Sequence, residues 1–236
     1  MDKYQIIAII AAIILFLIIM VLSSRTRIYK TYLKYLKVSN KANLTGKELA
    51  FASKQNLELT DLQFALTDET IGDAYSPKYK TLILSKEVCE TASLSSLTIV
   101  AHELGHDCQH KESSGLFFTS QLFTKMTMIT NKLIVPLLVI GMLLFLLKYP
   151  DDQLGEALMI ASGIFFLLHV FNKIITIPLE YDASRRALKY LKEYNFVSPG
   201  EYRRAKKLLG IAAQTYIASF LDGLFIIKFK KKKRKK

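Results

Sequence analysis

Residues 98–112 of the chain read TIVAHELGHDCQHKE, and this stretch holds three of its four histidines. Residues four positions apart on an α-helix lie on one face, one turn apart. His102 and His106 can therefore direct their imidazole nitrogens at one metal ion, and Glu103 can reach a water molecule beside it. The pattern His-Glu-x-x-His is typical of zinc sites that hydrolyse peptide bonds.

The presence of Glu103 favours a hydrolytic zinc site over a structural one. A hydrolytic zinc has three protein ligands and one position for water, whereas a structural zinc usually has four protein ligands. Zinc lowers the pKa of that water to about 7 and polarises the carbonyl group under attack. We expect Glu103 to take the proton of the water and to pass it to the leaving amine. A structural or regulatory zinc site in a non-hydrolytic protein is the alternative, and it has no need of a base.

Neither of the other histidines suits the third ligand position. His110 is eight residues from His102, about 80° round the helix, so we expect it to be exposed or to lie outside the ligands. His169 falls within an apolar segment and is expected to pack between helices. Cys89 and Cys108 match no cysteine zinc motif, and two cysteines do not make a disulfide framework.

Four long apolar segments predict a membrane protein. Residues 4–22, 128–147, 157–179 and 209–229 are each about long enough to cross a bilayer. We therefore predict a mostly α-helical, polytopic protein with three to four transmembrane helices and a small zincin-like α+β unit that carries the His-Glu-x-x-His helix. Residues 25–41 contain six basic and no acidic residues, which places that side in the cytosol. The expected location is the plasma membrane, with the site on the cytoplasmic side.

Glu180 is the third-ligand candidate that this topology suggests. The segments 128–147 and 157–179 form a hairpin that returns the chain to the side of the histidines, and Glu180 is the first acidic residue after it. A glutamate on a second helix is a known third ligand for this motif. The other interpretation is an acid in the first turn of a helix, and the residues alone leave both open.

The chain is predicted to divide into six parts. These are an anchor (1–23), a soluble metallopeptidase unit (24–127), a transmembrane hairpin (128–179), a cytosol-facing helical segment with the third ligand (180–208), a fourth apolar segment (209–229) and a basic tail (230–236). If all four apolar segments cross, the tail lies outside, against the positive-inside tendency. The sequence leaves open whether residues 209–229 cross.

Local signals predict the elements of the soluble unit. Thr45 to Glu48 and Ser198 to Glu201 have capping-box spacing and should each begin a helix. A partly alternating strand is expected at 57–66, a turn around Pro77 and a second strand at 81–85. The helix with the histidines should begin near residues 93–96.

The net charge of +13 is largely a property of the tail. Residues 228–236 hold eight basic residues, and the rest of the chain carries +5. A basic tail beside an apolar segment favours contact with anionic lipid on the cytoplasmic leaflet, or it serves only to fix topology. We do not expect nucleic-acid binding.

Four segments in this order resemble the YugP-type bacterial membrane zinc metallopeptidases: AYSPKYKTLILS, VAHELGHDCQH, LEYDASRRAL and EYRRAKKLLGIAAQTYIAS. The resemblance covers residues 57–227. It implies one zinc ion held by His102, His106 and Glu180, a protein or peptide substrate, and Glu103 as acid and base. It also suggests Asp182 as a residue that orients a histidine ligand. Arg185 and Arg186 match as well, and one of them could stabilise the oxyanion or contact lipid.

The resemblance also bears on substrate binding. Proteases with this motif hold an extended substrate against an edge strand near the zinc helix, by main-chain pairing that tolerates many sequences. This implies that Thr81, Leu82, Ile83 and Leu84 form such an edge strand. A purely structural hairpin is the alternative.

Overall fold

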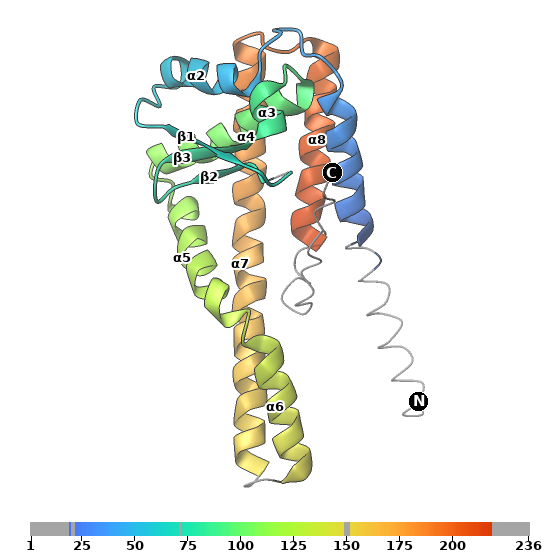
Figure 1. Ribbon diagram of the computed structural model, residues 1–236. Coiled ribbons are helices and arrows are strands. Elements are labelled where there is room, and N and C mark those ends of the chain that lie inside the picture. The colour runs from blue at the N-terminus through green and yellow to red at the C-terminus, as the bar shows by residue number, and fades with distance from the viewer. Residues whose placement is uncertain (1–18, 20–21, 71, 149–151, 219–236) are drawn as a thin grey trace.

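The computed structural model (Figure 1) describes residues 19, 22–70, 72–148 and 152–218. A helix over residues 22–36 comes first. The other elements are α2 (Gly46–Asn56), β1 (Gln63–Thr67), β2 (Ala74–Ser76), β3 (Thr81–Ser85), α3 (Lys86–Glu90), α4 (Leu94–Lys111), α5 (Gly115–Thr130), α6 (Ile134–Leu147), α7 (Asp152–Glu193) and α8 (Pro199–Ala218). The prediction of a mostly helical chain with a small sheet is confirmed.

The predicted helix starts are confirmed by their capping contacts. The Thr45 side chain accepts from Glu48 N–H, and the Glu48 carboxylate accepts from Thr45 N–H at 2.7 Å, which completes a capping box at α2. Ser93 Oγ accepts from Ser96 N–H at 3.0 Å and begins α4. Ser198 and Glu201 cap α8 in the same reciprocal way.

The sheet has the strand order β1-β3-β2. The central strand β3 pairs parallel with β1 and antiparallel with β2. The prediction that Thr81, Leu82, Ile83 and Leu84 form an edge strand open to substrate is therefore wrong, because both sides of β3 are paired. The edges are β1 and β2. The first strand also begins later than predicted, at Gln63, because Leu59 and Leu62 are buried from a turn that precedes it.

Helix α4 lies at the centre of the compact upper part and contacts α2, the sheet, α7 and α8. Its buried leucines, valine and alanine join one core with the neighbouring elements: Leu94, Leu97, Val100, Ala101 and Leu104. Since α4 is packed on several sides, its remaining faces can hold polar side chains in fixed positions.

Helix α7 runs without interruption for 42 residues, with Pro178 inside it. The predicted boundary between residues 179 and 180 thus lies within one helix, about 63 Å long, that joins the apolar segment to the segment with Glu180. Glu180 is not in the first turn of a helix. The alternative explanation for this glutamate is therefore excluded.

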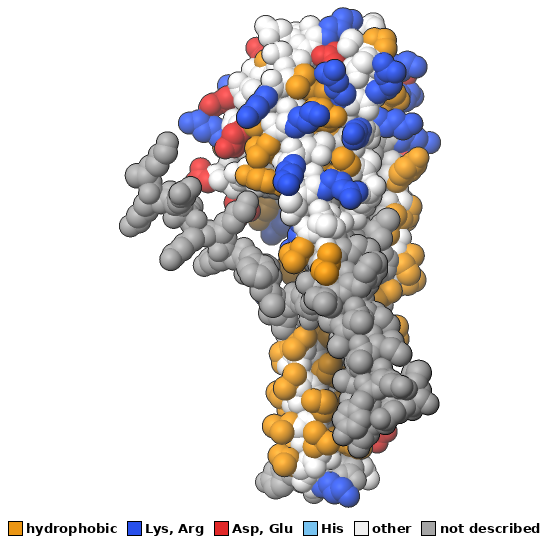
Figure 2. All heavy atoms as spheres, turned by 90° about the vertical axis from the view of Figure 1, so that its right-hand side faces the viewer, with side chains coloured by type: hydrophobic (Ala, Val, Ile, Leu, Met, Phe, Trp, Pro, Cys, Tyr) orange, Lys and Arg blue, Asp and Glu red, His pale blue; other side chains and the backbone are white. Residues whose placement is uncertain are grey.

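The apolar hairpin consists of α6 and the lower part of α7, which together we call the stalk (Figure 1). Helices α5 and α6 are bent by 43° relative to each other at a short break. The two stalk helices approach closely at Gly141, where an added Cβ would lie 2.8 Å from the carbonyl oxygen of Gly155. Many large apolar side chains of the stalk face outward, and Figure 2 shows them on the face it displays.

Among the described residues, α7 is long and apolar enough to cross a membrane, and the bent pair α5–α6 is a second candidate. The first predicted span, residues 4–22, lies almost wholly outside the described residues. The fourth apolar segment begins inside α8, and its residues 219–229 lie outside the described part, as does the basic tail. The number of spans therefore stays a prediction.

Candidate metal centre

Two helices supply the three side chains of the candidate metal centre. His102 and His106 lie one turn apart on α4, and Glu180 lies on α7. One possible ligand atom from each lies within 4.8 Å of the others. Among the residues that the structure describes, no other group of three or more histidine, cysteine or acidic side chains is placed to hold a metal ion. The structure brings together the three predicted ligands.

The spacing of the ligand atoms suits a zinc ion. Glu180 Oε2 lies 3.1 Å from His102 Nε2 and 3.3 Å from His106 Nε2. Ligand atoms about 2.0–2.1 Å from a tetrahedral zinc are separated by about 3.3 Å. All three side chains are largely buried, so few water molecules compete with the ligands.

The other nitrogen of each imidazole has its own partner, and this fixes the ring. His106 Nδ1 lies 3.0 Å from Gln109 Oε1, which accepts a hydrogen bond from it. His102 Nδ1 lies 3.3 Å from Ser184 Oγ. With protons on both Nδ1 atoms, both Nε2 lone pairs face the centre, which is the arrangement that a metal ion requires.

Gln109 connects the two helices behind the metal group. It is fully buried, and its amide nitrogen donates to the Leu179 carbonyl oxygen and to Asp182 Oδ2, both at 2.9 Å. Asp182 therefore reaches His106 through Gln109 and not directly. Sequence reasoning missed Gln109 and Ser184. Their spacing is a partial signal in the sequence, because Gln109 lies three residues after His106 and Ser184 lies four residues after Glu180.

The two arginines of the LEYDASRRAL segment pair with the same aspartate. Arg186 Nε donates to Asp182 Oδ2 and its Nη1 to Glu112 Oε1, both at 2.6 Å. The Arg185 guanidinium lies 2.5 Å from Asp182 Oδ1, and its side chain is 73% exposed. An oxyanion role for Arg185 stays a prediction, while its contact in this structure is a surface ion pair.

Glu103 is positioned beside the metal group by the edge strand β2. The carboxylate is partly buried, and Oε2 accepts a hydrogen bond from the main-chain N–H of Tyr75 at 2.9 Å. Burial raises the pKa of the Glu103 carboxyl, although the neighbouring His102 and His106 oppose this effect. A raised pKa brings a carboxylate closer to the range in which a general base works at neutral pH.

The remaining candidates lie away from the centre. His110 contacts the phenol of Tyr75, and His169 is a buried residue of α7 itself, three turns before Glu180. Both cysteines are free thiols, and neither belongs to the metal group. Burial raises the pKa of Cys108 to about 11, so this thiol stays protonated and is a poor metal ligand.

Helix α4 and helix α7 meet at Gly105. An added Cβ there would lie 2.6 Å from the Ala183 carbonyl oxygen. Gly105 therefore permits the close approach of the two helices between the turns that carry the possible ligands.

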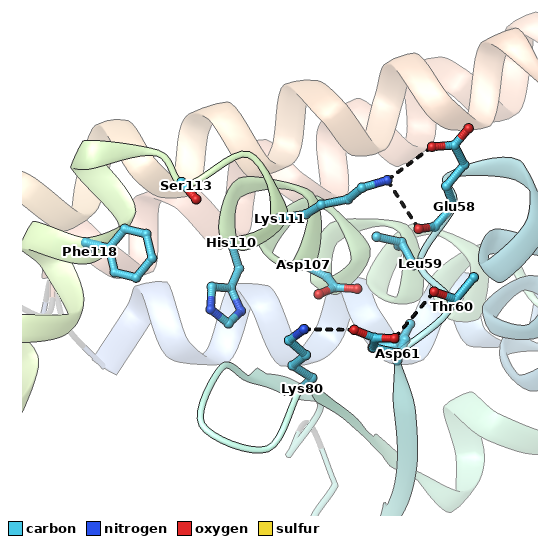
Figure 3. A pocket seen from close by; sticks show the side chains of 11 residues that line it. Glu58, Leu59, Thr60, Asp61, Lys80, Asp107, His110, Lys111, Ser113 and Phe118 are labelled. Atoms are coloured by element: carbon cyan, nitrogen blue, oxygen red, sulfur yellow. Dashed lines mark hydrogen bonds and ion pairs between the residues drawn. The ribbon is translucent and has the colours of Figure 1, made fainter.

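A cavity of about 360 Å³ opens beside the C-terminal end of α4 (Figure 3). Asp107, His110 and Phe118 line it, together with two ion pairs, Lys80–Asp61 and Lys111–Glu58. None of the three possible metal ligands lines this cavity.

Comparison with known proteins identifies the family. The family described as "Putative neutral zinc metallopeptidase" matches residues 8–228. The chain belongs to this family of zinc metallopeptidases. It is also similar to the "Putative membrane protease YugP" of Bacillus subtilis (strain 168), with 31% identity over 201 residues and 84% of each chain covered. No solved structure matches the chain.

Proposed function

We propose that this metallopeptidase is a membrane-embedded zinc endopeptidase that cleaves membrane-associated proteins or peptides. His102, His106 and Glu180 hold the ion, and Glu103 is the general base. The observation that carries the proposal is the convergence of two Nε2 atoms and one carboxylate oxygen beside a partly buried glutamate.

The side chains present fit the ion and the reaction. When bound, zinc polarises the substrate carbonyl and lowers the pKa of a coordinated water. Glu103 accepts the proton of the attacking water and delivers it to the leaving nitrogen. Gln109 Oε1 can only accept a hydrogen bond, so it holds His106 in the tautomer that leaves Nε2 unprotonated, while Ser184 Oγ fixes the orientation of the His102 ring through Nδ1. Such support for the ligands is worth about 10- to 100-fold in metal affinity.

The position of α7 supports a site close to the membrane. The same helix carries Glu180 and continues into the apolar stalk. Residues 25–41 hold six basic and no acidic residues, which favours the cytosolic side of the plasma membrane. The Bacillus relative is named a membrane protease. A multi-pass protein with its site at the cytosolic boundary is consistent with all three observations.

The outer edge of β2 is the position that supports substrate pairing. β2 is bonded to β3 on one side, and the main chain of Tyr75 reaches Glu103 on the other. A peptide lying along this edge would pass the metal group and the base, while the Tyr75 N–H stays bonded to Glu103. Strand addition of this kind is sequence-tolerant. The basic tail lies outside the described residues, and we retain anionic lipid as its proposed partner.

The test is cleavage of an unstructured protein by the purified chain in detergent micelles. We expect cleavage that stops when a chelator removes the metal and returns when zinc is restored. A preparation that holds one zinc per chain and cleaves no unstructured protein would instead favour a structural or regulatory zinc.

A further inference from the structure

Tyr75, the middle residue of β2, contacts α4 at two points. Its main-chain N–H donates to Glu103 Oε2 at 2.9 Å, and its phenol oxygen lies 2.7 Å from His110 Nδ1. Glu103 and His110 are seven residues apart, so they lie on one face of α4 about 10 Å apart along its axis. A single tyrosine thus connects the catalytic glutamate to the end of its own helix.

β2 needs such a connection because it is short. The strand has three residues and pairs with β3 at the edge of the sheet. A short edge strand with few main-chain hydrogen bonds opens more easily than the core. The contact between the Tyr75 hydroxyl and His110 adds a second fixed point, on the side of the strand that faces α4.

His110 is itself held firmly. Its ring stacks on Phe117 with centroids 5.3 Å apart and meets the edge of Phe118 at 5.9 Å. Both phenylalanines belong to the first turn of α5. Figure 3 shows His110 and Phe118 at the same end of the cavity. The imidazole is therefore fixed by aromatic packing, and Tyr75 binds to a rigid partner.

The phenol is suited to a lasting hydrogen bond. Burial raises the pKa of the Tyr75 hydroxyl, and the hydrogen bond and charge of the neighbouring Asp107 carboxylate raise it further. The hydroxyl thus keeps its proton at any pH at which the protein works. His110 is outside the group of possible metal ligands, so its contact with Tyr75 does not compete with the ion.

We propose that Tyr75 and His110 are a positioning pair for the catalytic base. Their contact holds β2 against α4, so that Tyr75 N–H fixes one oxygen of the Glu103 carboxylate and leaves the other oxygen to accept the proton of the attacking water. A carboxylate that is already held in its reactive orientation need not reorient before the proton transfer, which lowers the barrier to the reaction. This inference rests on the proposed function, because it assumes that Glu103 is the base.

The test compares Tyr75→Phe, His110→Phe and the double variant with wild type in peptide cleavage. Tyr75→Phe removes the hydroxyl and keeps the main-chain N–H, while His110→Phe keeps the aromatic packing. We expect each to lower kcat about tenfold, the order expected for one hydrogen bond, with KM and zinc content unchanged. The double variant should be no slower than Tyr75→Phe, because Tyr75→Phe already removes the whole hydroxyl, including its interaction with Asp107.

Two further variants control for general effects of the substitutions. Tyr190→Phe removes the hydroxyl of another buried tyrosine, which accepts a hydrogen bond from Asn56 Nδ2 at 3.3 Å. This variant should leave kcat unchanged. His110→Asn keeps a hydrogen-bonding group close to the position of Nδ1 and should recover part of the rate lost in His110→Phe.

Three results would overturn the positioning pair. They are a wild-type kcat in Tyr75→Phe, losses that multiply in the double variant, and loss of zinc from either single variant. Glu103→Gln is measured beside them. If Glu103→Gln is inactive and Tyr75→Phe is normal, the positioning pair fails and the proposed function stands. If Glu103→Gln cleaves as wild type does, the proposed function fails first.

Discussion

Gly105 of α4 lies directly against the backbone of Ala183 of α7, and a Cβ at residue 105 would come within 2.6 Å of the Ala183 carbonyl oxygen. The contact falls between the two helices that carry the possible metal ligands. Because a backbone atom cannot rotate away as a side chain can, a larger residue must push the helices apart. The distance between the imidazoles and Glu180 thus depends on a glycine.

Gly105→Ala should weaken both folding and zinc binding. We expect the free energy of unfolding to fall by about 1–3 kcal/mol, as for other overpacked sites, together with a loss of zinc affinity. Thermal unfolding in detergent and zinc content measure the two effects. Gly210→Ala is the matched control, because an added Cβ there meets no atom within 4 Å. A normal zinc affinity in Gly105→Ala would show that the helix spacing does not set the ligand geometry.

Gln109→Leu should lower zinc affinity about 10- to 100-fold. The substitution keeps the volume of the side chain roughly constant but removes the hydrogen bonds of Gln109 with His106 Nδ1, the Leu179 carbonyl oxygen and Asp182 Oδ2. A competition titration with a zinc-binding dye measures the change. Gln55→Leu, at an exposed position of α2, is the control and should bind zinc as tightly as wild type. If Gln109→Leu binds zinc as tightly as Gln55→Leu does, Gln109 does not support the histidine ligand.

Arg185→Ala separates the two roles considered for this arginine. Its exposed contact with Asp182 is worth about 0–1 kcal/mol in stability, so we expect kcat/KM within about threefold of wild type. Loss of an oxyanion-stabilising group would instead lower kcat about 100- to 1000-fold. Steady-state kinetics with a peptide substrate distinguishes the outcomes, and a drop of the larger size would place Arg185 in the reaction.

Zinc binding should release a proton near neutral pH. In the metal-free protein, burial lowers the pKa of His106, but the hydrogen bond and charge of Glu180 outweigh burial and raise it to about 9. Imidazole must be unprotonated to bind a metal, so zinc affinity should rise with pH up to about 9. Calorimetry in buffers of different ionisation enthalpy counts the released protons. Affinity that does not change between pH 7 and 9 would contradict this.

The same pKa predicts how the metal-free protein responds to pH. The folded-state pKa of His106 lies above its ordinary value of 6.5. Its contribution to stability is therefore complete below pH 6.5 and is lost as the pH rises through about 9. Glu180→Gln removes the carboxylate that raises the pKa of His106. The melting temperature of this variant should therefore fall less than that of wild type between pH 6.5 and about 9. The same loss in both proteins would assign it to other groups.

The metal group could be predicted because it depends on local geometry and on one topological argument. The spacing of His102 and His106 fixes their common face once the segment is a helix. The hairpin made Glu180 a candidate, and the resemblance to the YugP-type metallopeptidases implied it as the third ligand. Helix starts at Thr45, Ser93 and Ser198 depend on contacts within a few residues, and they too were predicted correctly.

Features that depend on distant contacts were missed. The edge position of β2 follows from parallel pairing of β1 with β3, and no local pattern encodes that order. Tyr75 meets Glu103 across 28 residues, and Gln109 meets Asp182 across 73. The continuity of α7 was hidden by Pro178 and by the change from apolar to charged residues, although one helix can contain both.

In the proposed site, a zinc ion held by His102, His106 and Glu180 works with Glu103 as the base. The most direct test of this site is a parallel measurement of zinc content and peptide cleavage for Glu103→Gln. We expect one zinc per chain, as in wild type, and no cleavage above the metal-free background. Wild-type cleavage by purified Glu103→Gln would contradict it.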